Sequence, residues 1–137
     1  MVYDPDLAPF SKWLDPDAED EELREAKADE FRAERWLITA EEDALIRRFV
    51  DLDLRLSLAG YATDRSLMEI KAALEAGRRG VLHLTGFTSE EINRLMDYEE
   101  DLSDQWFQAL EDLCDYRRSH PMDGTLEDLT PSLPSPN

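Results

Sequence analysis

"TAEEDALIRRFVDLDLRLSLAG" (residues 39–60) decides whether this chain is all-α or mixed. Apolar and polar residues alternate strictly over residues 50–58, which is typical of a β-strand. Apolar residues also fall on one seam of a helix, at Leu45, Phe49, Leu52, Leu56 and Ala59. Thr39 and Glu42 make a capping box ahead of this seam, and no residue breaks the chain between them. We therefore predict a central helix over 40–59 that ends at Gly60, with a strand over 50–58 as the alternative.

The segments on either side of this helix also have helical patterns. Residues 17–36 are rich in Ala, Glu, Leu and Arg, which favour a helix, and their thin apolar stripe places it on the surface. Ser66 and Glu69 make a second capping box, and Gly77 and Gly80 are typical helix ends.

The last predicted helix is the longest. Thr88 and Glu91 make a third capping box, and the pattern continues over residues 89–116. A short apolar stretch, residues 81–87, is interpreted as a connector because a single strand would have no partner.

These elements predict an all-α fold, an irregular bundle of about four helices. Residues 1–16 contain three prolines among aromatic residues, so we expect an extended arm that packs back onto the domain. Residues 17–119 form the predicted helical domain. Residues 120–137 are rich in Pro, Ser, Thr and Asp, which is typical of a disordered tail.

Composition limits the classes of function. The 137 residues suit one domain, and the single cysteine excludes an intramolecular disulfide. We expect a cytoplasmic protein, because no apolar run approaches the ~18 residues that span a bilayer and no signal peptide is recognisable. A net charge of −18 repels DNA, RNA and anionic membranes, so a partner that uses this charge must be basic.

The charge is unevenly distributed along the chain. Residues 88–116 hold ten carboxylates against one basic residue, Arg94. On a helix, five of these ten fall with Gln108 on a single ridge spaced by four and three residues, and Glu100 flanks it. The candidate docking residues on this helix are Asp97, Glu100, Asp101, Asp104, Glu111 and Asp115.

A second candidate patch lies at the start of the first helix, at Asp17, Glu21, Glu22 and Glu25. Both acidic regions could instead be solvated faces that only maintain solubility. Glu99 lies on the apolar side of the last helix, so it needs a partner. We expect an ion pair with Arg48 or Arg55; a functional carboxylate is the alternative.

The sequence favours neither an enzyme nor a metal protein. With His83, His120 and Cys114 as the only imidazoles and thiol, zinc and di-iron ligand sets cannot be assembled. Calcium-loop and glycine-rich phosphate-loop spacings are also missing, so we expect no cofactor. Residues 81–96 have helix-turn-helix offsets, but the would-be recognition helix is acidic and phosphates would repel it.

Two non-enzymatic functions remain. In the first, the acidic faces dock on a basic protein surface, such as that of a nucleic-acid-binding protein; nucleic-acid-mimicking inhibitors and immunity proteins work this way. In the second, the chain is a helical adaptor or assembly subunit that binds through apolar contacts, including Phe10 and Trp13. The sequence does not fix the oligomeric state.

Overall fold

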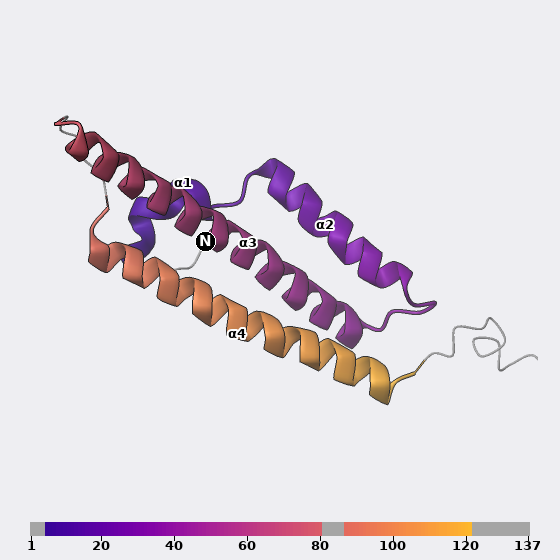
Figure 1. The fold of residues 1–137 in the computed structure, drawn as a ribbon. Coiled ribbons are helices and arrows are strands. Elements are labelled where there is room, and N and C mark those ends of the chain that lie inside the picture. The colour runs from indigo at the N-terminus through magenta and orange to yellow at the C-terminus, as the bar shows by residue number, and fades with distance from the viewer. Residues whose placement is uncertain (1–4, 81–86, 122–137) are drawn as a thin grey trace, which may run out of the picture.

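The computed structural model describes residues 5–80 and 87–121. In these ranges all regular secondary structure is helical, which confirms the all-α prediction (Figure 1). The elements are a 3-10 helix, η1, and four α-helices. Their bounds are Pro5–Phe10 for η1, Ser11–Leu14 for α1, Ala18–Ala33 for α2, Ala40–Arg78 for α3 and Ser89–Ser119 for α4.

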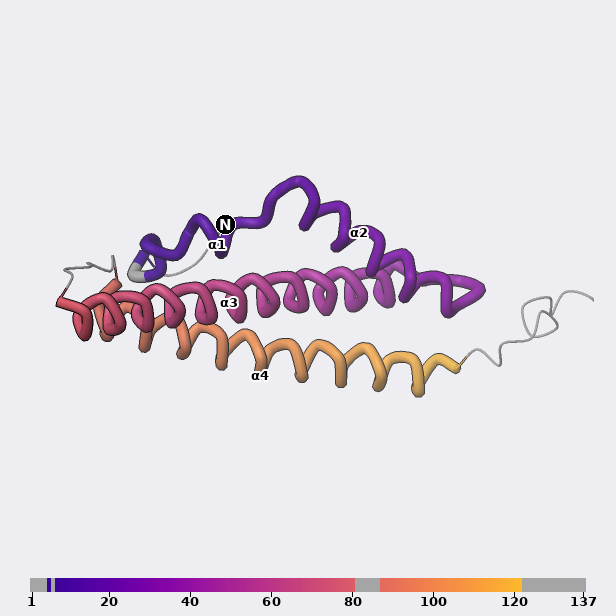
Figure 2. The backbone as a smooth tube through the Cα atoms, turned by 45° about the horizontal axis from the view of Figure 1, so that its top comes forward, coloured from indigo at the N-terminus to yellow at the C-terminus, as the bar shows by residue number. Residues whose placement is uncertain are grey.

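Helix α3 is the centre of the molecule. Its 39 residues extend about 58 Å, and α4 runs beside it along most of that length (Figure 2). Helix α2 lies along the N-terminal half of α3 on the side away from α4, and α1 lies over its C-terminal half. The fold is therefore a long helical pair, α3 with α4, covered on one side by shorter N-terminal helices.

The predicted end of the central helix at Gly60 is wrong. Helix α3 continues through Gly60, and Ser66 is buried inside it, where its hydroxyl donates to the Thr63 carbonyl at 3.0 Å. Ser66 is therefore not a helix cap. A glycine ends a helix when its backbone turns left-handed, whereas Gly60 keeps a helical backbone against α4. The strand alternative for residues 50–58 is excluded because these residues lie inside α3.

The N-terminal segment packs back onto the domain as expected, but as short helical turns. Leu7, Phe10 and Leu14 are buried, and the Phe10 ring stacks on Phe87 with centroids 4.8 Å apart. Proline is compatible with this 3-10 turn, and burial of three apolar side chains holds the segment in place. Phe10, which was predicted to contact a partner, is fully buried within the fold.

Helix α4 starts where its capping box predicts. The Thr88 hydroxyl accepts from the Glu91 amide, and the Glu91 carboxylate accepts from the Thr88 amide at 2.9 Å. One side of α4 is buried on α3, through Ile92, Leu95, Leu102, Ala109 and Leu113. The predicted tail, apart from His120 and Pro121, and the predicted connector, apart from Phe87, lie outside the described residues.

Candidate docking surface

The predicted ridge on α4 is fully exposed. We define the α4 ridge as the carboxylates Asp97, Glu100, Asp101, Asp104, Glu111 and Asp115, each of which is exposed. Asp115 forms an ion pair with Arg118 in the last turn. Within the described part of the chain, none of the other five has an ion-pair or hydrogen-bond partner. The ridge is thus an array of unneutralised carboxylates on one rigid helix.

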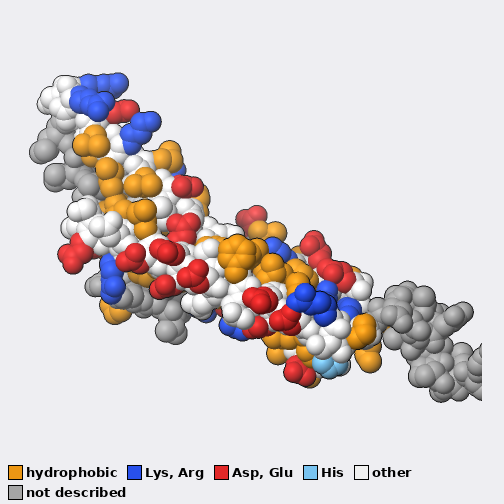
Figure 3. All heavy atoms as spheres, turned by 60° about the horizontal axis from the view of Figure 1, so that its bottom comes forward, with side chains coloured by type: hydrophobic (Ala, Val, Ile, Leu, Met, Phe, Trp, Pro, Cys, Tyr) orange, Lys and Arg blue, Asp and Glu red, His pale blue; other side chains and the backbone are white. Residues whose placement is uncertain are grey.

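The position of the ridge follows from the helical angle of each residue. Asp112 is turned towards α3, where its carboxylate accepts from Arg48 at 3.0 Å and from the Gln108 amide at 2.9 Å. The ridge residues point away from α3, beyond the reach of its arginines. Figure 3 shows acidic side chains along the outward face of α4.

The second predicted patch is different, because its carboxylates are used within the fold. Asp17 caps α2 in a reciprocal box with Asp20. Glu21 is paired with Arg24, and Glu25 lies 3.5 Å from Arg47. Of the four predicted residues, only Glu22 has neither an ion pair nor a side-chain hydrogen bond in the described structure.

Two apolar side chains lie beside the α4 ridge and were missed by sequence reasoning. Phe107 is 62% exposed and Met96 is 48% exposed. At 100° per residue, their angular positions differ by about 20°, next to Glu100 and Glu111. The same angular count, applied to the sequence, could have found these two side chains. Aromatic residues and methionine are enriched at protein interfaces, so both side chains are additional candidate contacts.

Glu99 is partly buried, but neither predicted arginine binds it. The Thr63 hydroxyl has one hydrogen, which Glu99 Oε1 and the Ala59 carbonyl share as acceptors, each 3.0 Å from Thr63 Oγ1. Arg48 is paired with Asp112, and Arg55 is paired with its own-helix neighbour Asp51 at 3.0 Å. The predicted ion pair with Arg48 or Arg55 is therefore wrong, and within the described structure the carboxylate instead accepts from a neutral hydroxyl on α3.

A buried ion cluster joins three helix ends. Glu42 is fully buried, and its Oε2 accepts from Arg117 Nε at 2.9 Å. Arg117 also donates to the Glu34 carboxylate at 2.9 Å and to the Phe31 carbonyl at 2.8 Å. Arg35 Nη2 lies 3.2 Å from Glu42 Oε1 and donates to the His120 carbonyl at 2.6 Å. This cluster fixes the ends of α2 and α4 on the start of α3.

A neighbouring pair links α2 to the first turn of α3. Arg32 Nε donates to Asp43 Oδ1 at 2.7 Å, and Arg47 Nε donates to Oδ2 at 3.0 Å. The hydrogen bond from Arg32, followed by that from Arg47, lowers the pKa of Asp43 below its ordinary value of 3.8. Asp43 is therefore a structural carboxylate.

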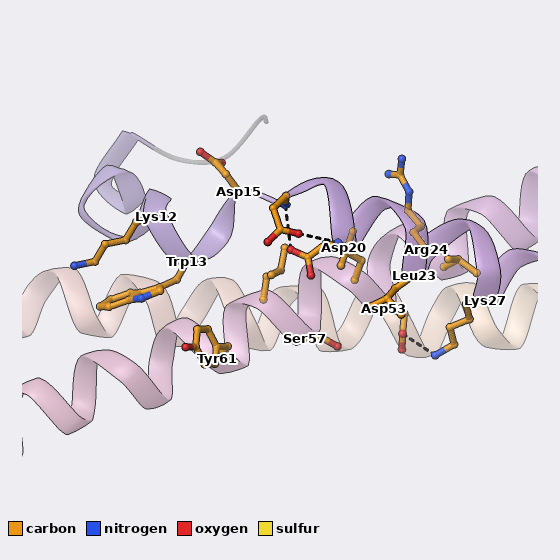
Figure 4. A pocket seen from close by; sticks show the side chains of 14 residues that line it. Lys12, Trp13, Asp15, Asp20, Leu23, Arg24, Lys27, Asp53, Ser57 and Tyr61 are labelled. Atoms are coloured by element: carbon orange, nitrogen blue, oxygen red, sulfur yellow. Dashed lines mark hydrogen bonds and ion pairs between the residues drawn. The ribbon is translucent and has the colours of Figure 1, made fainter.

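A groove of about 500 Å³ lies between the N-terminal helices and α3 (Figure 4). Its apolar lining comes from Trp13, Leu23, Val50, Leu54 and Leu58. The charged residues at its edge are mostly engaged: Lys27 Nζ lies 2.7 Å from Asp53, and Lys12 Nζ lies 4.4 Å from the Trp13 ring centroid. Trp13, which was predicted to contact a partner, is half-buried at this groove.

The described residues contain no group of three or more His, Cys, Asp or Glu side chains arranged to hold a metal ion. Their helices also include none that is long and apolar enough to cross a bilayer. Comparisons of the chain with models of protein families, with curated proteins and with solved structures gave no match in any of the three.

Proposed function

We propose that this protein is a non-enzymatic interaction protein that docks the α4 ridge on a basic surface of a partner protein. The observation that supports this proposal is the concentration of carboxylates without partners along one face of α4. Every basic residue from Arg24 to Arg55 takes part in an ion pair, whereas five ridge carboxylates have no partner among the described residues. Unpaired like charges on one helix repel each other, and a Lys/Arg-lined surface would relieve that repulsion.

The spacing of the carboxylates along the α4 ridge indicates which kind of basic surface would fit it. The ridge carries six carboxylates over about 27 Å, a mean spacing of ~5.4 Å, whereas duplex DNA carries one phosphate per ~1.7 Å. The ridge therefore resembles a single row of phosphates more closely than a duplex. We propose a partner with one line of basic residues and an adjacent apolar pocket for Phe107.

The test compares two double variants that change the net charge equally. Asp101→Lys with Asp104→Lys alters the α4 ridge, and Glu30→Lys with Asp64→Lys is the control, because both control residues are exposed and have no ion pair in the described structure. Each immobilised variant captures proteins from the host lysate, and mass spectrometry identifies them. We expect a protein that wild type and control retain, that the ridge variant loses, and that ~0.5 M salt elutes. An identical set of proteins on all three would refute the proposal.

A second candidate function is an adaptor that binds through apolar contacts. Since Phe10 is buried, this alternative now rests on other residues, chiefly Trp36 and Leu37 in the connection between α2 and α3, which are 54% and 61% exposed. Binding by these residues should change little with salt. A captured partner that resists ~0.5 M salt and is lost from a Trp36→Ala variant would favour the adaptor.

A further inference from the structure

The side of α3 that α2 covers continues past the groove, where α1 lies over part of the C-terminal half, to the last turns of α3, which none of the described helices covers on this side. Near its start, α3 faces α2 through Asp43, which binds Arg32, and Arg47, which pairs with Glu25. Helix α2 lies beside the N-terminal half of α3 only (Figures 1 and 2). Tyr61, at the edge of the groove, is 53% exposed, and Met68, beyond it, is 59% exposed.

The exposed continuation has the spacing of a coiled-coil seam. Its residues follow one another at intervals of four, three, four, three and four, which places them in one line on a helix. All six are exposed. We define the α3 seam as Tyr61, Arg65, Met68, Ala72, Glu75 and Arg79.

The surface of the seam has a shallow, open depression. It is bounded by Arg65, Met68, Glu69 and Ala72. These positions are i, i+3, i+4 and i+7, which is the arrangement of the four residues that surround one side chain of a facing helix in a coiled coil. The seam therefore has the geometry to accept a helical partner.

The order of residues along the seam identifies that helix. If two seams run antiparallel with their centre at Ile70, Met68 faces Ala72, a large side chain against a small one. In the next layer Arg65 faces Glu75, and in the outermost layer Tyr61 faces Arg79, an aromatic ring against a cation. Each layer occurs twice by symmetry, so the seam is complementary to itself.

We propose that the α3 seam binds the α3 seam of a second copy of this chain, antiparallel, in a two-fold dimer. Arg65 and Glu75 have no ion-pair partner within the described residues, so both are available for the intermolecular pair. Residues 61–80 hold four basic and three acidic residues, a balance of +1, in a chain of net charge −18. Two copies therefore repel each other least along this segment.

The test is the mass of the full chain in solution, measured by sedimentation equilibrium over a concentration series. We expect the wild type to approach twice 15.8 kDa as concentration rises. Arg65→Glu places a second carboxylate against Glu75 in both layers and should raise the dimer Kd at least ~10-fold. Adding Glu75→Arg restores opposite charges and should return the Kd to near the wild-type value. Arg118→Glu, the same charge change on α4, should leave the Kd within about threefold of wild type.

Spin labels attached to an Arg78→Cys variant, in a chain that also carries Cys114→Ser, test whether the two α3 helices of the dimer run antiparallel. The antiparallel dimer separates the two labels by about 24 Å along the helix axis, whereas a parallel dimer places them side by side. Three results would overturn the proposal: a monomer at every concentration, a double variant that does not recover dimerisation, or adjacent labels. Because Arg65 and Glu75 are exposed, circular dichroism should show unchanged helicity in every variant.

Discussion

Replacing Arg117 by methionine should destabilise the fold strongly, because Arg117 is the main partner of a buried carboxylate. Glu42 is 1% exposed at its side chain, and Arg117 Nε binds it at 2.9 Å while the same guanidinium holds Glu34 and the Phe31 carbonyl. Methionine keeps most of the alkyl stem of arginine. The loss of stability therefore reports on the charge of Arg117 and its hydrogen bonds. Removing one partner of a buried pair costs about 3–5 kcal/mol.

Arg35, the second ion-pair partner of Glu42, reduces this expected loss of stability. Arg35 Nη2 stays 3.2 Å from the other Glu42 oxygen, and Arg117 itself is 17% exposed. We therefore expect Arg117→Met to lower the free energy of unfolding by about 3 kcal/mol, a large part of the 5–15 kcal/mol of a typical domain.

Urea unfolding followed by circular dichroism at 222 nm measures this change, with the slope m expected to stay constant. Arg118→Met is the matched control, because Arg118 is the next residue and its pair with Asp115 is solvent-exposed; its effect should be below ~0.5 kcal/mol. Combining Arg117→Met with Glu42→Gln should show a coupling energy above ~1 kcal/mol. A loss for Arg117→Met within ~1 kcal/mol of the Arg118 control would refute the reasoning.

Two further predictions concern other internal contacts. Because hydrogen bonds from Arg32 and then Arg47 lower the pKa of Asp43, its carboxyl should titrate by NMR below 3.8, and Arg32→Gln should move the midpoint upward. This stabilisation is complete above pH ~4 and is lost as the pH falls through the lowered pKa; an unshifted midpoint would contradict the assignment. A Cβ on Gly60 would lie 3.3 Å from Glu99 Oε2, so Gly60→Ala should stabilise by ~1 kcal/mol in a Glu99→Ala background and by clearly less in the wild type. Equal gains in urea unfolding would show that the two residues are not in contact.

The amphipathic character of α4 could be predicted from sequence because the direction of a side chain on a helix depends only on its residue number. The same count predicts the exposed carboxylates and the buried Leu95 and Leu102. It could not predict which acids would be neutralised. That outcome depends on where the arginines of α2 and α3 lie in space, as the difference between Asp112 and Asp104 shows.

The length of α3 could not be predicted because its local signals favour two shorter helices. A glycine inside a helix costs about 1 kcal/mol relative to alanine. Ala59, Ala62 and Ser66 are fully buried around Gly60, and continuous packing of this kind outweighs the local penalty. The capping pattern at Ser66 is thus a coincidence of spacing inside a longer helix.

Two identical capping motifs behave differently in this chain. At Thr88, the Glu91 carboxylate turns back to the amide and closes the box. At Thr39, the hydroxyl accepts from the Glu42 amide, but the Glu42 carboxylate turns inward to Arg117, 75 positions along the chain. A pattern of four residues cannot include a partner so distant, so the buried cluster was beyond local reasoning.

The two proposed surfaces differ in charge. Four basic residues without ion pairs in the described structure lie on the C-terminal part of α3, at Arg65, Lys71, Arg78 and Arg79, among the unpaired acids Asp64, Glu69 and Glu75. The unpaired carboxylates of the ridge lie on α4, and the proposed dimer layers involve α3 alone, so the dimer would leave both ridges free. A partner with two basic surfaces would then be held at two points, and its apparent affinity would rise with dimer formation without any new contact. Arg65→Glu should remove that gain while leaving the affinity of each single ridge unchanged.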